Sequence, residues 1–117
     1  MPTIQQKDNI VAGMPLIQEI SPIREEITIR EVIDTYPDLE WVMKCESNFR
    51  QFDKGKVLRG KINPYDVGIF QINEIVWGRK AKELGYDIYT LEGNLLMGVF
   101  IFDTYGINQW ECVKNKT

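Results

Sequence analysis

The chain has 117 residues, of which 44% are apolar and 26% charged, and this composition indicates one globular domain rather than two domains or a disordered chain. It contains no histidine and two cysteines, which excludes Ser-His-Asp and Cys-His catalysis and a four-ligand zinc site and assigns any proton transfer to Asp, Glu, Tyr or Lys. None of the usual metal-ligand spacings appears, and we expect neither a metal nor a cofactor. The formal net charge of −3 argues against a nucleic-acid partner, and the longest apolar run, Leu95 to Phe102, is too short to cross a bilayer.

Residues 1–26 form the least regular part of the sequence. Prolines interrupt this stretch and its periodicity is weak, so we expect an irregular N-terminal segment before a domain that spans residues 27–117. The apolar patch from Ile10 to Ile17 has no basic run before it and no convincing cleavage site, which is not the pattern of a signal peptide. Two interpretations stay open: a protein that remains inside the cell, or a trimmed form of an exported one.

The first helix is expected over Thr28–Tyr36, where apolar residues recur at an imperfect helical spacing before Pro37. A second helix is expected from Asp38 to about Ser47, with Asp38 as its N-cap. The apolar residues of this second helix predict one core-facing stripe, made of Trp41, Val42, Cys45 and Phe49. Glu46 lies beside that stripe, near the C-terminal end of the helix.

Residues 50–66 carry the β-like signal of the chain. The turn sequence Asp53-Lys54-Gly55 precedes the apolar pair Val57 and Leu58, which predicts a small hairpin or a structured loop. The same stretch is basic, which predicts either a solvated loop or a rim that faces an anionic polymer. Its basic residues are Arg50, Lys54, Lys56, Arg59 and Lys61.

Two further helices are expected in the second half of the chain. One runs over about Glu74–Leu84 and ends at Gly85. The other runs over about Glu92–Tyr105 and ends at Gly106; it is apolar nearly all round, so we expect it to be the central core helix. Together with the hairpin, these helices predict a mainly α fold (α+β), in which the hairpin region forms one wall of a cleft and Glu46 lies at the junction.

Three segments carry side chains suited to chemistry. In Cys45-Glu46-Ser47-Asn48-Phe49, a carboxyl group lies at the edge of an apolar stripe, where burial raises the pKa toward that of a general acid. In Asp66-Val67-Gly68-Ile69-Phe70-Gln71-Ile72-Asn73, the last two amides supply hydrogen-bonding groups two residues apart. Gly106-Ile107-Asn108-Gln109-Trp110 places a tryptophan after the core helix. Taken singly, each segment is better explained as structure: a solvated glutamate, a turn and a core tryptophan.

Taken together, the order E-S-N-F, D-x-G-I-F-Q-I-N and G-x-N-x-W resembles the lysozyme-like superfamily over about Ile27 to Cys112. The amino-acid sequences of the first two motifs are closest to those of c-type lysozymes. The overall plan, with Asn94 opening a long apolar helix, is similar to the catalytic (SLT) domain of soluble lytic transglycosylases. The resemblance implies a lysozyme-like single domain that cleaves the β-1,4 bond between N-acetylmuramic acid and N-acetylglucosamine in peptidoglycan, as a muramidase or as a lytic transglycosylase.

The resemblance also implies roles for individual residues. Glu46 matches the general acid, and Asp66 matches the position of the second carboxylate of c-type lysozymes. In c-type lysozymes the glutamate, whose pKa is raised by an adjacent tryptophan that forms a wall of the site, donates the proton, while the aspartate stays ionised. The other matching positions are implied to contact the substrate or to brace the glutamate; they are Ser47, Gln71, Asn73 and Trp110. Lytic transglycosylases usually brace the glutamate with an alanine-tyrosine-asparagine segment that has no clean match in this chain, and Tyr105 is the residue that could substitute for it.

The sequence departs from both families. C-type lysozymes carry four disulfides, whereas this chain can form at most one, and lytic transglycosylases usually lack an aspartate at the position of Asp66. The group that accepts the cleaved sugar therefore stays open: it is either water or the muramyl 6-hydroxyl. A structural role for Asp66, in a turn or a helix cap, also stays open. We expect Cys45 and Cys112 to be close in space, and bonded if the protein is exported; two buried free thiols are the alternative.

The function predicted from these residues is that of a peptidoglycan-cleaving glycosidase. Its partners would be glycan strands, and we expect it to act as a monomer in the periplasm, the cell wall or the extracellular space. The alternatives are a non-catalytic glycan- or protein-binding module that kept the fold, and an intracellular interaction domain. The presence of Glu46 favours the enzyme.

Overall fold

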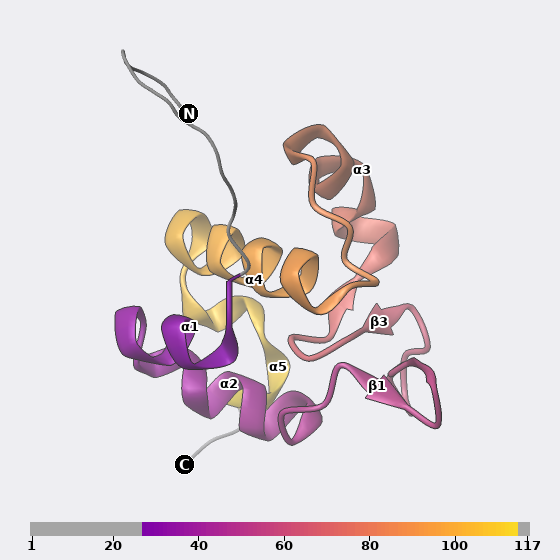
Figure 1. The fold of residues 1–117 in the computed structure, drawn as a ribbon, viewed down its shortest axis with the longest axis horizontal. Coiled ribbons are helices and arrows are strands. Elements are labelled where there is room, and N and C mark those ends of the chain that lie inside the picture. The colour runs from indigo at the N-terminus through magenta and orange to yellow at the C-terminus, as the bar shows by residue number, and fades with distance from the viewer. Residues whose placement is uncertain (1–26, 115–117) are drawn as a thin grey trace, which may run out of the picture.

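The computed structural model describes residues 27–114, with side chains as far as Cys112; the irregular segment expected for residues 1–26 lies outside the described residues. Helices and two small antiparallel hairpins make up the described part, as expected for the α+β class (Figure 1). In chain order the elements are α1 (Ile29–Thr35), α2 (Asp38–Ser47), β1 (Phe52–Asp53), β2 (Lys56–Val57), β3 (Asp66–Val67), β4 (Ile72–Asn73), α3 (Glu74–Leu84), α4 (Leu91–Tyr105), the 3-10 helix η1 (Ile107–Gln109) and α5 (Glu111–Lys114).

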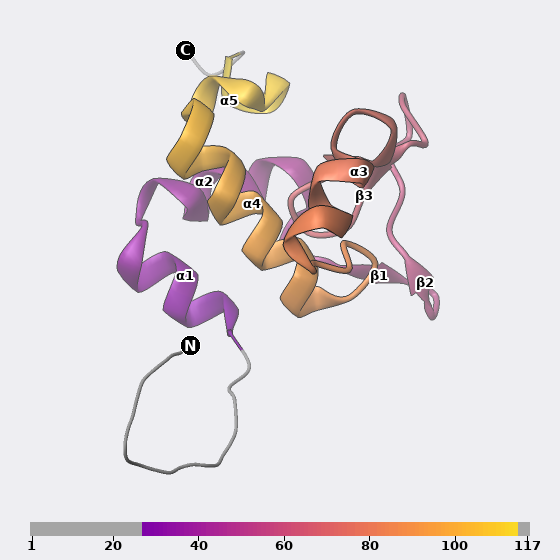
Figure 2. The ribbon, with the colours of Figure 1, turned by 90° about the horizontal axis from the view of Figure 1, so that it is seen from above.

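Helix α4 forms the middle of the fold. Figures 1 and 2 show it between α1 and α2 on one side and α3 with the hairpins on the other. Its side chains Leu95, Met97 and Ile101 are almost completely buried, and burial of a side chain of this size contributes about 1.5–3 kcal/mol. The prediction that this segment is the central core helix is confirmed.

Several helix ends follow local sequence signals. Thr28 begins α1 with a capping box: its hydroxyl accepts from the N–H of Glu31 at 3.1 Å, and the Glu31 carboxylate accepts from the N–H of Thr28 at 2.8 Å. Helix α3 ends at Gly85, whose φ of 81° is left-handed, and α4 ends at Gly106. The ends expected at Gly85 and Gly106 are therefore confirmed.

The start of α2 differs from the expectation that Asp38 is its N-cap. Pro37 takes that position with helical backbone angles (φ −55°, ψ −31°), and no side chain caps the helix. The chain turns directly from α1 into α2, because the N–H of Leu39 bonds the carbonyl of Tyr36 and the N–H of Glu40 bonds that of Pro37. Asp38 is instead the first helical residue, where its carboxylate is near the positive end of the helix dipole.

The buried side of α2 also differs from the expected stripe. Its fully buried apolar residues are Leu39, Val42 and Met43. The other members of the expected stripe, Trp41, Cys45 and Phe49, are only partly buried. The helix is covered from two directions, by the core cluster and by α5, to which a disulfide between Cys45 and Cys112 joins it.

Two hairpins lie at the other side of the fold. The turn between β1 and β2 is Lys54-Gly55, both with positive φ (54° and 80°), which is the backbone hand that two-residue hairpin turns favour. The small hairpin expected in this region is confirmed. The pairing of β3 with β4, which sets Asp66 opposite Asn73, was not expected, because each strand has two residues and no alternation marks it.

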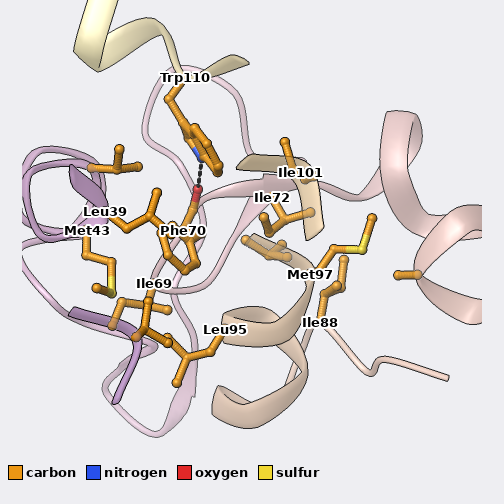
Figure 3. Packing of buried hydrophobic residues seen from close by; sticks show 14 residues of the cluster. Leu39, Met43, Ile69, Phe70, Ile72, Ile88, Leu95, Met97, Ile101 and Trp110 are labelled. Atoms are coloured by element: carbon orange, nitrogen blue, oxygen red, sulfur yellow. Dashed lines mark hydrogen bonds between the residues drawn. The ribbon is translucent and has the colours of Figure 1, made fainter. Parts of the chain in front are cut away.

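The core is built around the loop that joins β3 to β4 (Figure 3). Ile69 and Phe70 of this loop are fully buried. Gly98 lets α4 approach closely, since a Cβ there would lie 2.1 Å from Cδ2 of Phe70. The carbonyl of Phe70 accepts a hydrogen bond from Nε1 of Trp110 at 2.8 Å, so the C-terminal tryptophan is fixed to the same loop.

Candidate active site

Asn94, in the first turn of α4, holds the loop between β3 and β4. Its side chain is fully buried, and its Nδ2 donates to the carbonyls of Val67 (3.0 Å) and Ile88 (2.8 Å). Its Oδ1 accepts from the N–H of Phe70 at 2.9 Å. One amide thereby bonds three buried backbone groups. The carbonyl of Ile88 also accepts from Nε2 of Gln51 at 3.3 Å.

Gln51 and Ser47 hold the same loop at Ile69. The Oε1 of Gln51 accepts from the N–H of Ile69 at 2.8 Å, and the Oγ of Ser47 donates to its carbonyl at 2.7 Å. Gly68 fits here because it has no Cβ: one would lie 2.3 Å from Nδ2 of Asn94 and 2.6 Å from Oε1 of Gln51, and its φ is 78°. Ser47, which the resemblance implies near the substrate, is buried and bonds the backbone.

A pocket of about 250 Å³ opens between the end of α2, the β3–β4 hairpin and the C-terminal segment. The structure brings together in its lining the predicted site residues Glu46, Asp66, Gln71, Asn73 and Trp110. These residues come from three separate sequence segments, so the chain folds the three motifs onto one site.

Glu46 lies in the last turn of α2 and is half-buried. Burial raises its pKa above the ordinary glutamate value; the N–H of Cys112, which donates to its Oε2 at 3.3 Å, acts in the opposite direction. The negative charges of Asp66 and Glu111 raise the pKa of Glu46 further. The net upward direction is the one that a general acid requires.

Asp66 is held in the pocket by Asn73. The Nδ2 of Asn73 donates to Oδ1 of Asp66 at 3.0 Å. The Oδ1 of the same asparagine caps α3 by accepting from the N–H groups of Ile75 and Val76, each at 3.0 Å. Asn73, and not Asp66, is therefore the helix cap, and it couples the position of the Asp66 carboxylate to the start of α3.

Gln71 and Trp110 line the pocket by different means. Gln71 has a left-handed backbone (φ 51°), and its Nε2 donates to the carbonyl of Gly68 at 3.0 Å. Trp110 is 5% exposed, and its ring packs against Phe70 with 5.6 Å between the centroids. The tryptophan is thus both a core residue and part of the pocket wall.

Tyr105 lies at the end of α4, outside the pocket lining. Its ring packs against Trp77, with 5.3 Å between the centroids, and against Phe100. Trp77 does line the pocket. Tyr105 therefore adjoins the candidate site through Trp77 and has no hydrogen bond to Glu46.

Cys45 and Cys112 form a disulfide, with 6.1 Å between their Cα atoms. The bond joins the last turn of α2 to α5. Because Cys45 precedes Glu46 and Cys112 follows Trp110 and Glu111, the bond joins two segments whose neighbouring residues line the pocket.

Several residues of the site were missed by the sequence analysis. The pocket is also lined by Asn63, Trp77, Ile101, Gln109 and Glu111. Glu111 lies between two residues that the sequence analysis had singled out, and this adjacency is the one signal that pointed to it. Gln51 gave no signal, because its partners are brought to it only by the fold.

The five basic residues of the stretch 50–61 are exposed and lie outside the pocket lining. Arg50 approaches Asp53 at 3.7 Å, and Arg59 pairs with Glu74 at 2.9 Å. The first of these pairs is half-exposed on both sides and contributes little energy. The arrangement favours the interpretation of a solvated loop.

A larger groove of about 700 Å³ lies on another face of α3, between that helix and the chain leading to α4. None of the predicted site residues lines it. The carboxylate of Glu74, the one that α3 contributes to this groove, accepts hydrogen bonds from Arg59 and from the hydroxyl of Tyr89 (2.5 Å). The bond from Arg59 is the main cause that lowers the pKa of Glu74. The pocket at Glu46 is therefore the better candidate for acid catalysis.

No family model, curated protein or solved structure matches the chain. Among residues 27–114, no helix is long and apolar enough to cross a membrane. Over the same residues, no group of three or more Cys, Asp or Glu side chains is arranged to hold a metal ion. The candidate site is therefore assigned from its own geometry.

The stability of the protein should report the ionisation of Glu46. Below the ordinary glutamate pKa, the group is protonated in both the folded and the unfolded state and adds no penalty. As pH rises from there through the raised pKa of the folded state, burial disfavours the ionised form, so the folded state loses stability. We expect Glu46→Gln to gain stability relative to wild type across this window, as measured by urea denaturation at several pH values.

Glu40→Gln is the matched control for this measurement, because Glu40 is exposed on the same helix. It removes one carboxyl group from α2 without touching the pocket. A free energy of unfolding of Glu46→Gln that stays constant or falls relative to that of wild type as pH rises would contradict the burial of the Glu46 carboxyl group.

Proposed function

We propose that the chain is a peptidoglycan-cleaving glycosidase that acts on the β-1,4 bond between N-acetylmuramic acid and N-acetylglucosamine, with Glu46 as general acid. One observation carries the proposal: a glutamate whose pKa burial raises lies in the same pocket as a second carboxyl group, that of Asp66. Cleavage of a glycosidic bond needs an acid that still holds its proton near the working pH. The chain contains no histidine that could take this role.

The surroundings of the two carboxyl groups support a division of labour. Glu46 gives its proton to the glycosidic oxygen as the bond to the sugar carbon breaks. Asp66, held by Asn73, presents a negative charge that stabilises the positive charge developing on the sugar ring. Trp77 and Trp110 offer apolar ring surface within the same pocket, which suits the faces of sugar rings.

Two acceptors can complete the reaction. In a hydrolase, water adds to the sugar carbon and leaves a reducing muramic acid end. In a lytic transglycosylase, Glu46, having lost its proton to the leaving sugar, takes the proton of the muramyl 6-hydroxyl, whose oxygen then closes an anhydro ring. The two products differ in mass by one water molecule.

Asp66→Asn is expected to lower the rate of cleavage by about a hundredfold or more, because it removes the negative charge beside the developing cation. The new amide can still accept the hydrogen bond from Asn73, so the fold should be kept. Initial rates of muropeptide release measure the effect. A loss of tenfold or less, together with anhydro products, would remove Asp66 from the catalytic groups and leave Glu46 to work alone as in a transglycosylase.

Loss of turbidity of a purified cell-wall suspension tests the proposed activity. Wild-type protein should clear the suspension. Binding to the wall without clearing would instead identify the non-catalytic glycan-binding module. We also propose that the protein works outside the cytoplasm, which the disulfide between Cys45 and Cys112 supports, since such bonds persist in oxidising compartments.

A further inference from the structure

Cys112 is connected to the catalytic end of α2 in two ways. Its sulfur is bonded to Cys45, the residue directly before Glu46. Its backbone N–H donates to Oε2 of Glu46 at 3.3 Å, and this is the hydrogen bond that the structure gives to the Glu46 carboxyl group within the described residues. The disulfide and the hydrogen bond therefore close a small ring through Cys45, Glu46 and Cys112.

The tryptophan wall is held independently of this ring. Nε1 of Trp110 donates to the carbonyl of Phe70 at 2.8 Å, and the ring is 5% exposed in the core cluster. Loss of the disulfide would therefore release the backbone at Cys112 while Trp110 continues to cover the pocket. The effect of burial on the Glu46 carboxyl group can therefore be separated by experiment from the effect of the N–H donor at Cys112.

We propose that Cys112 is a positioning residue: its disulfide to Cys45 fixes the backbone N–H that orients the carboxyl group of Glu46. A carboxyl group at the end of a glutamate side chain is free to rotate unless a donor fixes one oxygen. With Oε2 held by Cys112, Oε1 is the atom left to present the proton to a substrate. The effect on catalysis rests on the proposed function, whereas the positioning of the carboxyl group does not.

The charges around Glu46 set the direction of the expected change. Asp66 faces it from β3 and Glu111 from α5, and both raise its pKa, as does burial; the N–H of Cys112 lowers it. When the N–H moves away and the wall at Trp110 stays, the lowering contribution is lost and the others remain. The pKa of Glu46 should therefore rise when the disulfide is removed.

The experiment compares the full-length wild type with the double variant Cys45→Ala/Cys112→Ala, which keeps the backbone N–H and adds no free thiol. Carbon NMR titration of the Glu46 carboxyl group reports its pKa without any substrate, and the NMR signal of the Trp110 indole N–H reports whether its bond to Phe70 is kept. We expect a higher pKa of Glu46 and an unchanged Trp110 signal. With peptidoglycan, turnover should fall roughly ten- to hundredfold, since small misplacements of an acid have effects of this size. The alkaline limb of the pH–rate profile should shift to higher pH. An unchanged or lower pKa of Glu46 in the folded variant would overturn the proposal.

A second measurement on the oxidised wild type keeps the test decisive if the double variant does not fold. The amide signal of Cys112 should titrate with the pKa of Glu46, and Glu46→Gln should abolish this titration. A Cys112 amide that does not respond to the ionisation of Glu46 would overturn the proposal. Because both NMR measurements are made without substrate, positive titrations combined with no activity on peptidoglycan would contradict the proposed function and leave the positioning role standing.

Discussion

Glu46→Gln is expected to abolish cleavage of peptidoglycan while leaving the fold intact. Glutamine keeps the shape of the side chain and can still accept the hydrogen bond from the N–H of Cys112, but it has no proton to transfer. Loss of a positioned acid lowers a rate by about 10²–10⁴-fold, which corresponds to roughly 3–5 kcal/mol of transition-state stabilisation. Initial rates of muropeptide release from purified peptidoglycan, with circular dichroism of the same samples, measure the two parts of this prediction.

Glu40→Gln serves as the control, since it makes the same chemical change on the exposed side of α2. Its rate should stay close to that of wild type. Turnover of Glu46→Gln near the wild-type rate, with a normal circular dichroism spectrum, would remove Glu46 from the reaction.

Asn94→Ala is expected to cause the largest loss of stability. The change leaves the N–H of Phe70 without its partner and takes the Asn94 donor from the carbonyls of Val67 and Ile88. Of these, the carbonyl of Ile88 keeps its bond from Nε2 of Gln51 at 3.3 Å. A buried group left without a partner costs about 1–3 kcal/mol, so with two such groups the free energy of unfolding should fall by roughly 2–5 kcal/mol. This is a large share of the ~5–15 kcal/mol that holds a domain of this kind together. Urea denaturation followed by circular dichroism measures the difference.

Asn108→Ala provides a matched control, because Asn108 is an exposed asparagine in η1. A surface change of this kind usually alters stability by less than about 0.5 kcal/mol. A loss of less than about 1 kcal/mol for Asn94→Ala would show that water or neighbouring groups replace its hydrogen bonds, since even one orphaned buried group costs that much.

The helices could be predicted from the sequence because their ends are set by neighbouring residues. Thr28, Gly85 and Gly106 act within one or two turns of the positions they define. The same reasoning was wrong at Asp38, where a proline that joins two helices took the place of the cap. Local signals therefore located the helices and failed where two of them meet.

The buried face of α2 and the β3–β4 hairpin could not be predicted in the same way. Which side of α2 is buried depends on α5, which approaches from the far end of the chain and is bonded to Cys45. The hairpin depends on Asn94 and Gln51, which hold its loop across 24 and 18 residues of sequence. Side chains that act over such separations leave no pattern in a local window.

The sequence predicted the residues of the candidate site better than it predicted the contacts between them. The three motifs supplied Glu46, Asp66 and Trp110, and the fold gathers them around one pocket. The link from Asn73 to Asp66 and the donor at Cys112 are visible only in three dimensions. Ser47 illustrates the limit: it matches a motif, yet its hydroxyl bonds the backbone of the loop it supports.

The most direct test of the proposed function is the mass of the glycan ends that wild-type protein releases from purified peptidoglycan, with Glu46→Gln in parallel. The proposed function predicts new muramic acid ends in the wild-type digest, either reducing ends or anhydro ends one water lighter. Over the same time the Glu46→Gln digest should contain at least about a hundredfold fewer such ends. Glycan strands left intact by folded wild-type protein, or the same new ends in both digests, would contradict it.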